Sequence, residues 1–274
     1  MKRTALSLFL ACLSIPVLLS TPAFGGDIEL RPIDKLSLDS ILSQISTIPT
    51  EGEASYLYKE CKNGDALSCS ALGLLYQNGD SVTKDKQLSI NLLGLSCAKG
   101  YGGGCADLAY RYKTGFIVNR DRTRAAKLYK RACDLRNGLG CGEFGAALFH
   151  GKGIEKSIKE ALPYLELACH NGHSESCPLA AKIYERGTEV EKDEFSAAHF
   201  YQAGCYAVIA GDCDEAKELT FRLLAGTCPT TGTYRCWDMA YWLKNHLEEA
   251  CSFDQTASCQ QLDNLDKKII KILN

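Results

Sequence analysis

Seven pairs of cysteines with one common spacing are the residues of this sequence whose types and positions most readily support chemistry. Seven residues separate the two cysteines of each pair, and the pairs use fourteen of the fifteen cysteines in the chain. A thiol pair can close a disulfide or supply two ligands to zinc, but zinc sites favour only about two to four residues between paired cysteines. We therefore predict local disulfides, with no metal site and no cofactor, that join Cys61 to Cys69, Cys97 to Cys105, Cys133 to Cys141, Cys169 to Cys177, Cys205 to Cys213, Cys228 to Cys236 and Cys251 to Cys259.

The first 25 residues have the pattern of a secretory signal peptide. A basic start is followed by an apolar stretch over residues 5–19 and by Ala23-Phe24-Gly25, which places small residues before a cleavage point. We predict that the mature protein is exported, to the periplasm or beyond it, where disulfides persist. Phe9-Leu10-Ala11-Cys12 faintly matches a bacterial lipid-attachment box, but the better interpretation is that Cys12 is discarded with the signal.

Composition and charge exclude some classes of partner. The 274 residues carry a formal charge of −2, with no polybasic block and no surface pattern of alternating basic and aromatic residues. We therefore expect no nucleic-acid partner. No run of 18 consecutive apolar residues follows the signal, so we expect no membrane span. We also expect the protein to be a monomer.

The cysteine pairs recur with the period of a stacked helical repeat. Their first members lie 36 residues apart from Cys61 to Cys205 and 23 residues apart after Cys205. In each 36-residue unit we predict two antiparallel helices. The first begins at an N-cap at Ser68, Gly104, Gly140, Ser176 or Asp212 and ends at Gly79, Gly115, Gly151 or Gly187. The second begins at Asp85, Asp121, Ser157 or Asp193 and runs to the next cysteine pair.

These elements divide the chain into four parts. We predict a signal peptide at 1–25, a leader with capping helices at 26–60, repeats at 61–213, and a C-terminal cap of single helices with two 23-residue units at 214–274. In the leader, Thr50 and Glu53 form a predicted capping box. The cap contains Trp237 and Trp242, for which packing onto the last repeat is a better interpretation than an aromatic binding patch.

The turn and cysteine motifs resemble a known repeat family. Tyr76-Gln-Asn-Gly79 and Tyr112-Lys-Thr-Gly115 are similar to the turn of Sel-one-like repeats, relatives of tetratricopeptide repeats. The added cysteine spacing and Lys130-Arg-Ala-Cys-Asp-Leu135 resemble the branch typified by the Helicobacter cysteine-rich proteins. The resemblance implies an all-α fold, a right-handed α/α solenoid of disulfide-stapled hairpins whose first helices line a concave groove for a protein or peptide. Some members of that branch are described as penicillin-binding proteins or weak β-lactamases.

The sequence contains short motifs found in such enzymes but not the structural surroundings in which those motifs act. Ser81-Val-Thr-Lys84 and Ser96-Cys-Ala-Lys99 match S-x-x-K, and Lys113-Thr-Gly115 matches K-T-G. In serine β-lactamases the K-T-G triplet lies on a strand, whereas here it falls in the turn that ends a repeat helix, and no S-D-N triplet occurs. We therefore predict an exported protein- or peptide-binding scaffold, with a β-lactamase-like hydrolase or penicillin-binding protein as the alternative.

Polar residues on the predicted first helices are the candidate ligand-binding positions. They vary from unit to unit while the apolar positions stay alike, and they are Asp107, Tyr110, Arg111, Glu143, His150, Lys182 and Arg186. A groove that reads an irregular ligand would show this variation, and so would a solvated helix face. His170 and His173 lie inside one cysteine loop, where we expect exposed polar residues rather than metal ligands.

Overall fold

The structure, a computed structural model, describes residues 37–45, 49–207, 213–226, 228, 234–252, 260–261 and 264. These residues form helices and the turns between them, and no strand occurs among them. The predicted signal peptide lies outside the described residues. None of the described helices combines the length and the apolar character needed to cross a membrane.

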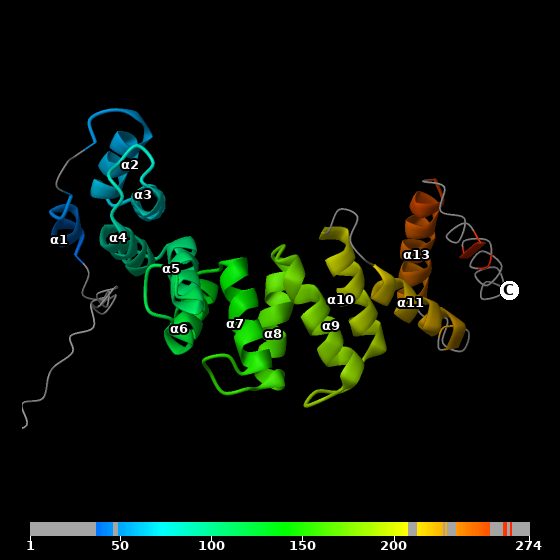
Figure 1. The fold of residues 1–274 in the computed structure, drawn as a ribbon. Helices are drawn as coiled ribbons and strands as arrows, with labels where there is room; N and C mark the ends of the chain where they lie inside the picture. Colours follow the sequence, from blue (N-terminus) through cyan, green and yellow to red (C-terminus); the bar gives the residue numbers. More distant parts are fainter. Residues whose placement is uncertain are drawn as a thin grey trace, which may run out of the picture.

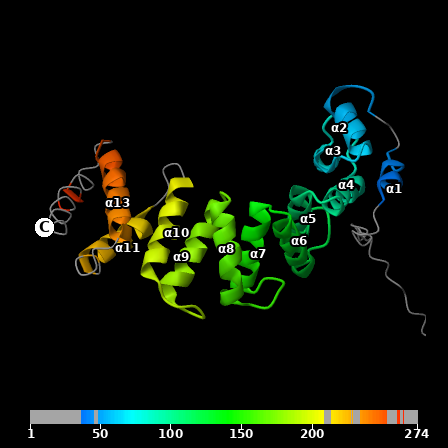
Figure 2. The same cartoon turned by 180° about the vertical axis from the view of Figure 1, so that it is seen from behind.

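The helices follow one another along an elongated stack (Figure 1). The opposite view in Figure 2 shows the same succession, from α1 and α2 at one end to α13 at the other. In chain order they are α1 (Leu38–Leu42), α2 (Gly52–Lys62), α3 (Ala66–Asn78), α4 (Lys86–Ala98), α5 (Gly102–Thr114), α6 (Arg122–Asp134), α7 (Gly138–His150), α8 (Ile158–His170), the short η2 (Ser174–Ser176), α9 (Cys177–Arg186), α10 (Glu194–Ala207), α11 (Asp214–Gly226) and α13 (Tyr234–Ser252). The odd-numbered helices from α3 to α9 are the first helices of the four hairpins, and α4, α6, α8 and α10 are the second.

Disulfides join each hairpin to the next, as predicted for the fold class. Each bond ties the second helix of one unit to the first helix of its successor, or to the element that takes that helix's place. Six of the seven predicted bonds are closed in this way, with Cα atoms 4.4 to 5.6 Å apart. They join Cys61 to Cys69, Cys97 to Cys105, Cys133 to Cys141, Cys169 to Cys177, Cys205 to Cys213 and Cys228 to Cys236.

The seventh predicted bond, at the C-terminal end of the ladder, differs from these six in one respect. Its first cysteine, Cys251, is the penultimate residue of α13. Its second cysteine, Cys259, lies outside the described residues. The bond between Cys251 and Cys259 therefore stays a prediction that rests on the shared spacing alone.

The helix ends predicted from the period are confirmed for the turn inside each hairpin. Gly79, Gly115, Gly151 and Gly187 end the first helices with φ between 63° and 86°, a conformation that glycine adopts without steric cost. Asp85, Asp121 and Ser157 each accept a hydrogen bond from a backbone N–H in the first turn of the second helix. Asp193 does the same for α10.

The predicted starts of the first helices are wrong in three units. Helix α3 begins three residues earlier than predicted, because Asp65 rather than Ser68 is its N-cap, and α7 is capped by Asn137 rather than Gly140. Helix α5 likewise begins after Tyr101, not Gly104. Ser176 is the N-cap of α9 as predicted, and Asp212 lies outside the described residues. Helix α2 is preceded by Glu51, so the capping box predicted at Thr50 is wrong.

The positions misread as caps instead bring neighbouring helices close together. A Cβ atom added to Gly140 would lie 2.5 Å from the Cβ of Ala132 and 2.9 Å from the backbone N of Cys133, both in α6. A Cβ on Gly145 would lie 2.8 Å from Cγ of Leu165 in α8. Gly140 and Gly145 are therefore required in α7 for close packing on both of its neighbours, and Gly140 does not start the helix.

Both ends of the described stack are covered by helices. Ile41, Leu42 and Ile45, in and just after α1, are buried with side chains of the first hairpin. At the other end α11 and α13 pack beside α10 (Figure 1). Trp242 is buried there at 4% exposure, as expected for packing, whereas Trp237 is 42% exposed, contrary to that expectation.

The cap of α3 gives a stability prediction with a definite pH dependence. Hydrogen bonds from the Ser68 side chain and backbone hold the pKa of Asp65 below its ordinary value of 3.8. A carboxylate with a lowered folded-state pKa stabilises the protein above its unfolded-state pKa, and that stabilisation is lost as the pH falls through the folded value. We expect Asp65→Ala to lower the free energy of unfolding by about 1 kcal/mol near neutral pH. The deficit should shrink in thermal melts as the pH falls below 3.8 and through the folded-state pKa of Asp65.

The matched control is Asp65→Asn, because asparagine caps about as well as aspartate but cannot titrate. It should melt near the native temperature at neutral pH. An Asp65→Ala deficit that is unchanged in acid would show that the carboxylate charge contributes nothing to the cap.

Candidate functional site

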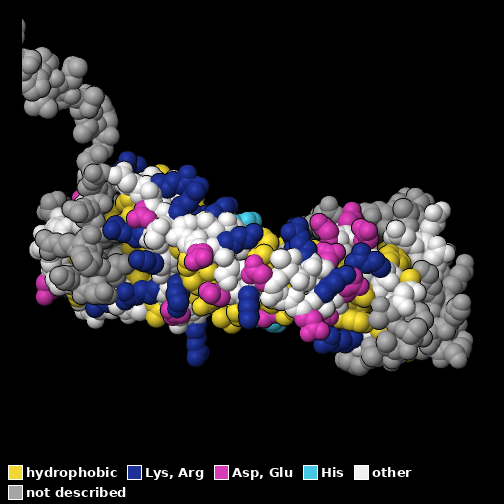
Figure 3. All heavy atoms as spheres, turned by 90° about the horizontal axis from the view of Figure 1, so that it is seen from below, with side chains coloured by type: hydrophobic (Ala, Val, Ile, Leu, Met, Phe, Trp, Pro, Cys, Tyr) yellow, Lys and Arg dark blue, Asp and Glu magenta, His cyan; other side chains and the backbone are white. Residues whose placement is uncertain are grey.

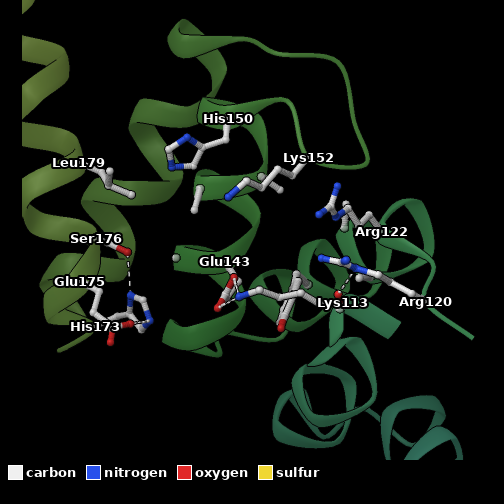
Figure 4. A pocket seen from close by; sticks show the side chains of 16 residues that line it. Lys113, Arg120, Arg122, Glu143, His150, Lys152, His173, Glu175, Ser176 and Leu179 are labelled. Carbon is white, nitrogen blue, oxygen red and sulfur yellow. Dashed lines mark hydrogen bonds and ion pairs between the residues drawn. The ribbon is translucent and has the colours of Figure 1, made fainter. Parts of the chain in front are cut away.

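A hollow of about 310 Å³ runs along α7. Its walls come from the first helices α5, α7 and α9, from η2, and from the buried side of α6. Figure 4 shows the charged side chains at its rim, with Arg120, Arg122 and Lys152 on one side and His173 and Glu175 on the other. The small side chains of alanines leave the hollow open, and these alanines are Ala125, Ala126, Ala146 and Ala147.

An ion pair between two repeats forms part of the wall. Nζ of Lys113, in the last turn of α5, lies 2.6 and 2.7 Å from the two carboxylate oxygens of Glu143 in α7. The Lys113 side chain is half-exposed and that of Glu143 is less so. The pair therefore neutralises both groups and leaves no net charge at this point of the wall.

Three further cations line the cavity without a carboxylate partner among the described residues. Arg120 uses its Nε to donate to the backbone oxygen of Lys113 at 3.0 Å. Arg122 and Lys152 make no ion pair within the described part of the chain. The backbones that carry them lie close together, because Gly153, with φ of 80°, is so close to the carbonyl group of Arg122 that no Cβ would fit there. Two turns of successive repeats thus place their cations at the same rim.

Tyr129 of α6 forms part of the cavity floor. Its side chain is only 3% exposed, and among the described residues its hydroxyl has no hydrogen-bond partner. Burial, and then the negative charge of Glu143, raise the pKa of Tyr129, so the hydroxyl keeps its proton. Tyr129 lines the cavity, and no hydrogen bond within the described residues engages its hydroxyl proton.

Two histidines stand at different ends of the hollow. Partial burial, and then the charges of Lys152 and Lys156, lower the pKa of His150, so His150 is neutral near neutral pH. His173 is mostly buried; its Nδ1 lies 2.8 Å from Oγ of Ser176 and its Nε2 lies 3.3 Å from a carboxylate oxygen of Glu175. The expectation of an exposed loop residue is therefore right for His170 and wrong for His173.

The seven predicted ligand-binding positions do not share one site. Glu143 and His150 line the cavity. Asp107, Tyr110 and Arg111 lie on α5, and Arg111 is 6% exposed because its guanidinium donates to Oε1 of Gln77 in α3 at 2.6 and 3.0 Å. Arg111 thus holds two repeats together. The remaining two, Lys182 and Arg186, are on α9 and are not cavity residues.

The sequence reasoning missed the cations and the tyrosine of the cavity. A signal for some of the cations was present, because a lysine or arginine recurs every 36 residues five positions after the helix-ending glycine, at Lys84, Arg120, Lys156 and Lys192. The Cβ atoms of these residues lie over their glycines, at 2.8 to 3.2 Å from the point where a glycine Cβ would be. No comparable sequence signal distinguishes Tyr129, because only packing shows that its hydroxyl faces a hollow.

The residues of the S-x-x-K and K-T-G motifs, on which the hydrolase alternative rests, lie in separate parts of the fold. Ser96 is buried in α4 and donates its hydroxyl to the backbone oxygen of Ala66 at 2.6 Å. Ser81 lies in the turn after α3. Lys113 belongs to the ion pair described above and sits at the end of a helix, not on a strand. No catalytic serine with a base beside it is found among these residues.

One group of potential metal ligands occurs among the described residues. Nε2 of His246 in α13 lies 3.1 Å from Sγ of Cys205, and Cys213 completes the group. Cys205 and Cys213 are bonded to each other as a disulfide. Because a thiolate is the form of cysteine that binds metals, this group offers a single imidazole ligand while the bond is closed.

The comparisons with known proteins agree on the fold. A Sel1 repeat model matches residues 66–101, 103–137, 138–173 and 179–207. The Sel1 repeat protein of Oxalobacter formigenes is 22% identical and superposes with a TM-score of 0.54 over 69% of this chain and 76% of that one. The protein c5321 of uropathogenic Escherichia coli, described as a protective antigen with an SLR fold, is 17% identical, with a TM-score of 0.52 over 87% of this chain and 64% of its own.

A shorter match is found with cysteine-rich protein B of Helicobacter pylori. It is 28% identical over 45% of this chain and 94% of that protein, with a TM-score of 0.37. No curated protein matches the chain in sequence. The Oxalobacter formigenes and Escherichia coli structures, with TM-scores above 0.5, show a shared fold and leave the ligand to be argued from the site.

Proposed function

Because its four repeats place this chain in the Sel1 repeat family, we propose that it is an exported, monomeric scaffold that binds a protein or peptide segment along its first helices. Repeat solenoids present extended surfaces of this kind, since each unit contacts only its neighbours and leaves one face open. The closed disulfides suit an oxidising compartment, which supports export.

The observation that carries the proposal is the cavity along α7. It is framed by three successive first helices, so an extended segment lying across them would contact several repeats at once. Its wall combines apolar alanine positions with ionic and hydroxyl groups, the mixture that holds a ligand and fixes its orientation. The disulfides at the α4–α5, α6–α7 and α8–α9 junctions hold the framework around it, so the site is formed before the ligand arrives.

A peptide selection followed by a blocking substitution tests this function. Peptides would be selected from a random phage-displayed library on the oxidised protein, then synthesised and measured by fluorescence anisotropy. Ala147→Trp places a large side chain in the hollow, and we expect it to weaken binding of the selected peptides by about tenfold or more. The physical reason is steric, so the loss should not depend on the charge of the peptide.

Leu139→Trp is the matched control for this experiment. Leu139 is an exposed residue of the same helix and does not line the cavity, so this tryptophan should leave affinity within about twofold of the native value. A selection that yields no binding peptide contradicts the scaffold function. Selected peptides that bind Ala147→Trp normally would place the binding surface elsewhere.

A further inference from the structure

We propose that the cavity along α7 binds an acidic peptide segment, whose carboxylates are neutralised by Arg122 and Lys152 and accept a hydrogen bond from the Tyr129 hydroxyl. This inference rests on the proposed binding function and names the chemistry of its ligand. It is carried by an excess of cations around the hollow and by one tyrosine in the cavity wall whose hydroxyl has no acceptor among the described residues.

The charges around the hollow do not cancel. Four cationic side chains line it, namely Lys113, Arg120, Arg122 and Lys152, against the two carboxylates of Glu143 and Glu175. Lys113 already binds both oxygens of Glu143, and Glu175 lies beside His173. The cavity therefore keeps a formal charge of +2 within a chain whose total is −2.

The backbone segments that carry the two free cations are held close together by the fold. Gly153, which follows Lys152 in the chain, packs tightly on the Arg122 backbone, and both Arg122 and Lys152 line the cavity. Burial is the larger cause of the lowered pKa of His150, and the charges of Lys152 and Lys156 lower it further, which places positive charge at this end of the hollow. A carboxylate placed between these side chains would gain charge-assisted hydrogen bonds.

Tyr129 supplies a donor that the protein itself does not use. Its ring is packed into the core between α5 and α7, and its protonated hydroxyl has no acceptor among the described residues. A ligand oxygen that reaches this hydroxyl would accept the hydrogen bond that no described residue accepts. A carboxylate oxygen can accept this hydrogen bond and can also neutralise the positive charge at the rim of the cavity.

The surroundings favour a peptide that extends beyond the hollow. The periodic cations Lys84, Arg120 and Lys156 are exposed in the turns of successive repeats, and Arg120 lines the cavity. Figure 3 views the molecule from the side on which the α7–α8 and α9–α10 turns lie in Figure 1, and it shows Lys and Arg side chains along most of that face, with Asp and Glu side chains among them. Several acidic residues in a row would meet these cations one repeat after another.

An acidic peptide fits this surface better than a nucleic acid does. Single-stranded nucleic acids bind where exposed aromatic rings stack on bases along a basic groove. The aromatic residue of this cavity, Tyr129, is buried and presents only its hydroxyl. A thymidine decanucleotide should therefore compete poorly with an acidic peptide for the site.

A matched pair of peptides tests the inference on the oxidised full chain. One is a fluorescein-labelled octapeptide with four consecutive glutamates and blocked termini, and the other carries glutamines at those positions. We expect the glutamate peptide to bind about tenfold more tightly in low salt, with the advantage shrinking as salt screens the charges. Arg122→Gln and Lys152→Gln should each weaken its binding by about five- to tenfold, and Tyr129→Phe by a similar factor.

Lys127→Gln is the control for charge, because Lys127 is an exposed residue of α6 outside the cavity and the change in net charge is the same. It should alter affinity by less than about twofold. Tyr129→Phe has a second readout, the thermal melt, which should not fall, since the removed hydroxyl bonds nothing in the described fold.

Three results would overturn the acidic-peptide inference. These are equal binding of the two peptides, an effect of Lys127→Gln as large as that of Lys152→Gln, or displacement of the glutamate peptide by the decanucleotide at equal concentration. The binding function would survive each of them if library-selected peptides of other composition still failed to bind Ala147→Trp. If library-selected peptides bound Ala147→Trp as tightly as the native protein, the proposed binding function of this cavity would be wrong.

Discussion

Full reduction of the oxidised protein is expected to abolish its cooperative thermal unfolding and most of its helical circular dichroism signal. Each described disulfide closes a loop of nine residues. In the chain-entropy model such a loop stabilises the fold by about 2.5 kcal/mol. Six such contributions, even with partial additivity, are comparable to the whole net stability of a typical domain, about 5 to 15 kcal/mol.

The architecture makes the loss larger than a count of contacts suggests. A hairpin in a solenoid buries its apolar face only against its neighbours, and the bonds lie at those junctions. Helices of about 13 residues, such as α5 and α6, are marginal in water when they are not packed. Without the bonds, the unfolded chain regains its freedom at every junction at once.

The measurement is a circular dichroism melt in excess phosphine reductant, with thiol titration to confirm that all bonds are open. Replacing Cys133 and Cys141 together by alanine opens one junction, and should lower the free energy of unfolding by about 2.5 kcal/mol without abolishing cooperativity. A cooperative melt that persists after every thiol has titrated would show that packing alone holds the array. Free thiols in the native protein would refute the pairing.

Replacement of Pro163 by alanine is expected to stabilise the protein by up to about 3 kcal/mol. Pro163 is the sixth residue of α8, which begins at Ile158 after its cap at Ser157. At that depth the proline removes the backbone hydrogen bond to the carbonyl of Lys159, and its ring crowds the same carbonyl. The side chain is exposed, so alanine restores the bond without leaving a cavity.

Denaturant unfolding measures this gain, and Lys159→Ala is its control. Lys159 is another exposed residue of the same helix, where alanine should change the free energy of unfolding by less than about 0.5 kcal/mol. A Pro163→Ala protein no more stable than the native one would mean that α8 accommodates its proline at no cost. A gain confined to the proline site would confirm that the penalty lies in the backbone.

The framework could be predicted because its causes are local. A glycine with positive φ ends a helix wherever the repeat places it, and an aspartate or serine caps the next helix through its own side chain, as Gly115 and Asp121 do. The cysteines needed no tertiary information either, since seven intervening residues bring the two thiols of a pair together across one junction. Starts of the first helices were misplaced because several residues before each cysteine are acceptable caps, as Asn137 and Gly140 show.

The candidate site could be predicted only in part. Glu143 and His150 were found because they are polar residues on a predicted first helix, and both line the cavity. Arg111 was misjudged on the same evidence. Its hydrogen bonds to Gln77 depend on how α5 packs on α3, and the sequence does not show that packing. Charge and variability mark a residue as polar but do not show whether a neighbouring repeat covers it.

By itself the sequence determined the repeat period, the hairpin turns and the disulfide ladder, since each follows from backbone conformation or from spacing along the chain. Only the tertiary structure decided where those units leave a hollow and which side chains face it. Tyr129 is the clearest case, because its ring is a core residue at helical spacing and its free hydroxyl exists only through the placement of α5, α6 and α7. The presence of both Arg122 and Lys152 at the cavity likewise depends on the contact between Gly153 and the Arg122 backbone. That contact joins two repeats, so the sequence of either repeat alone does not predict it.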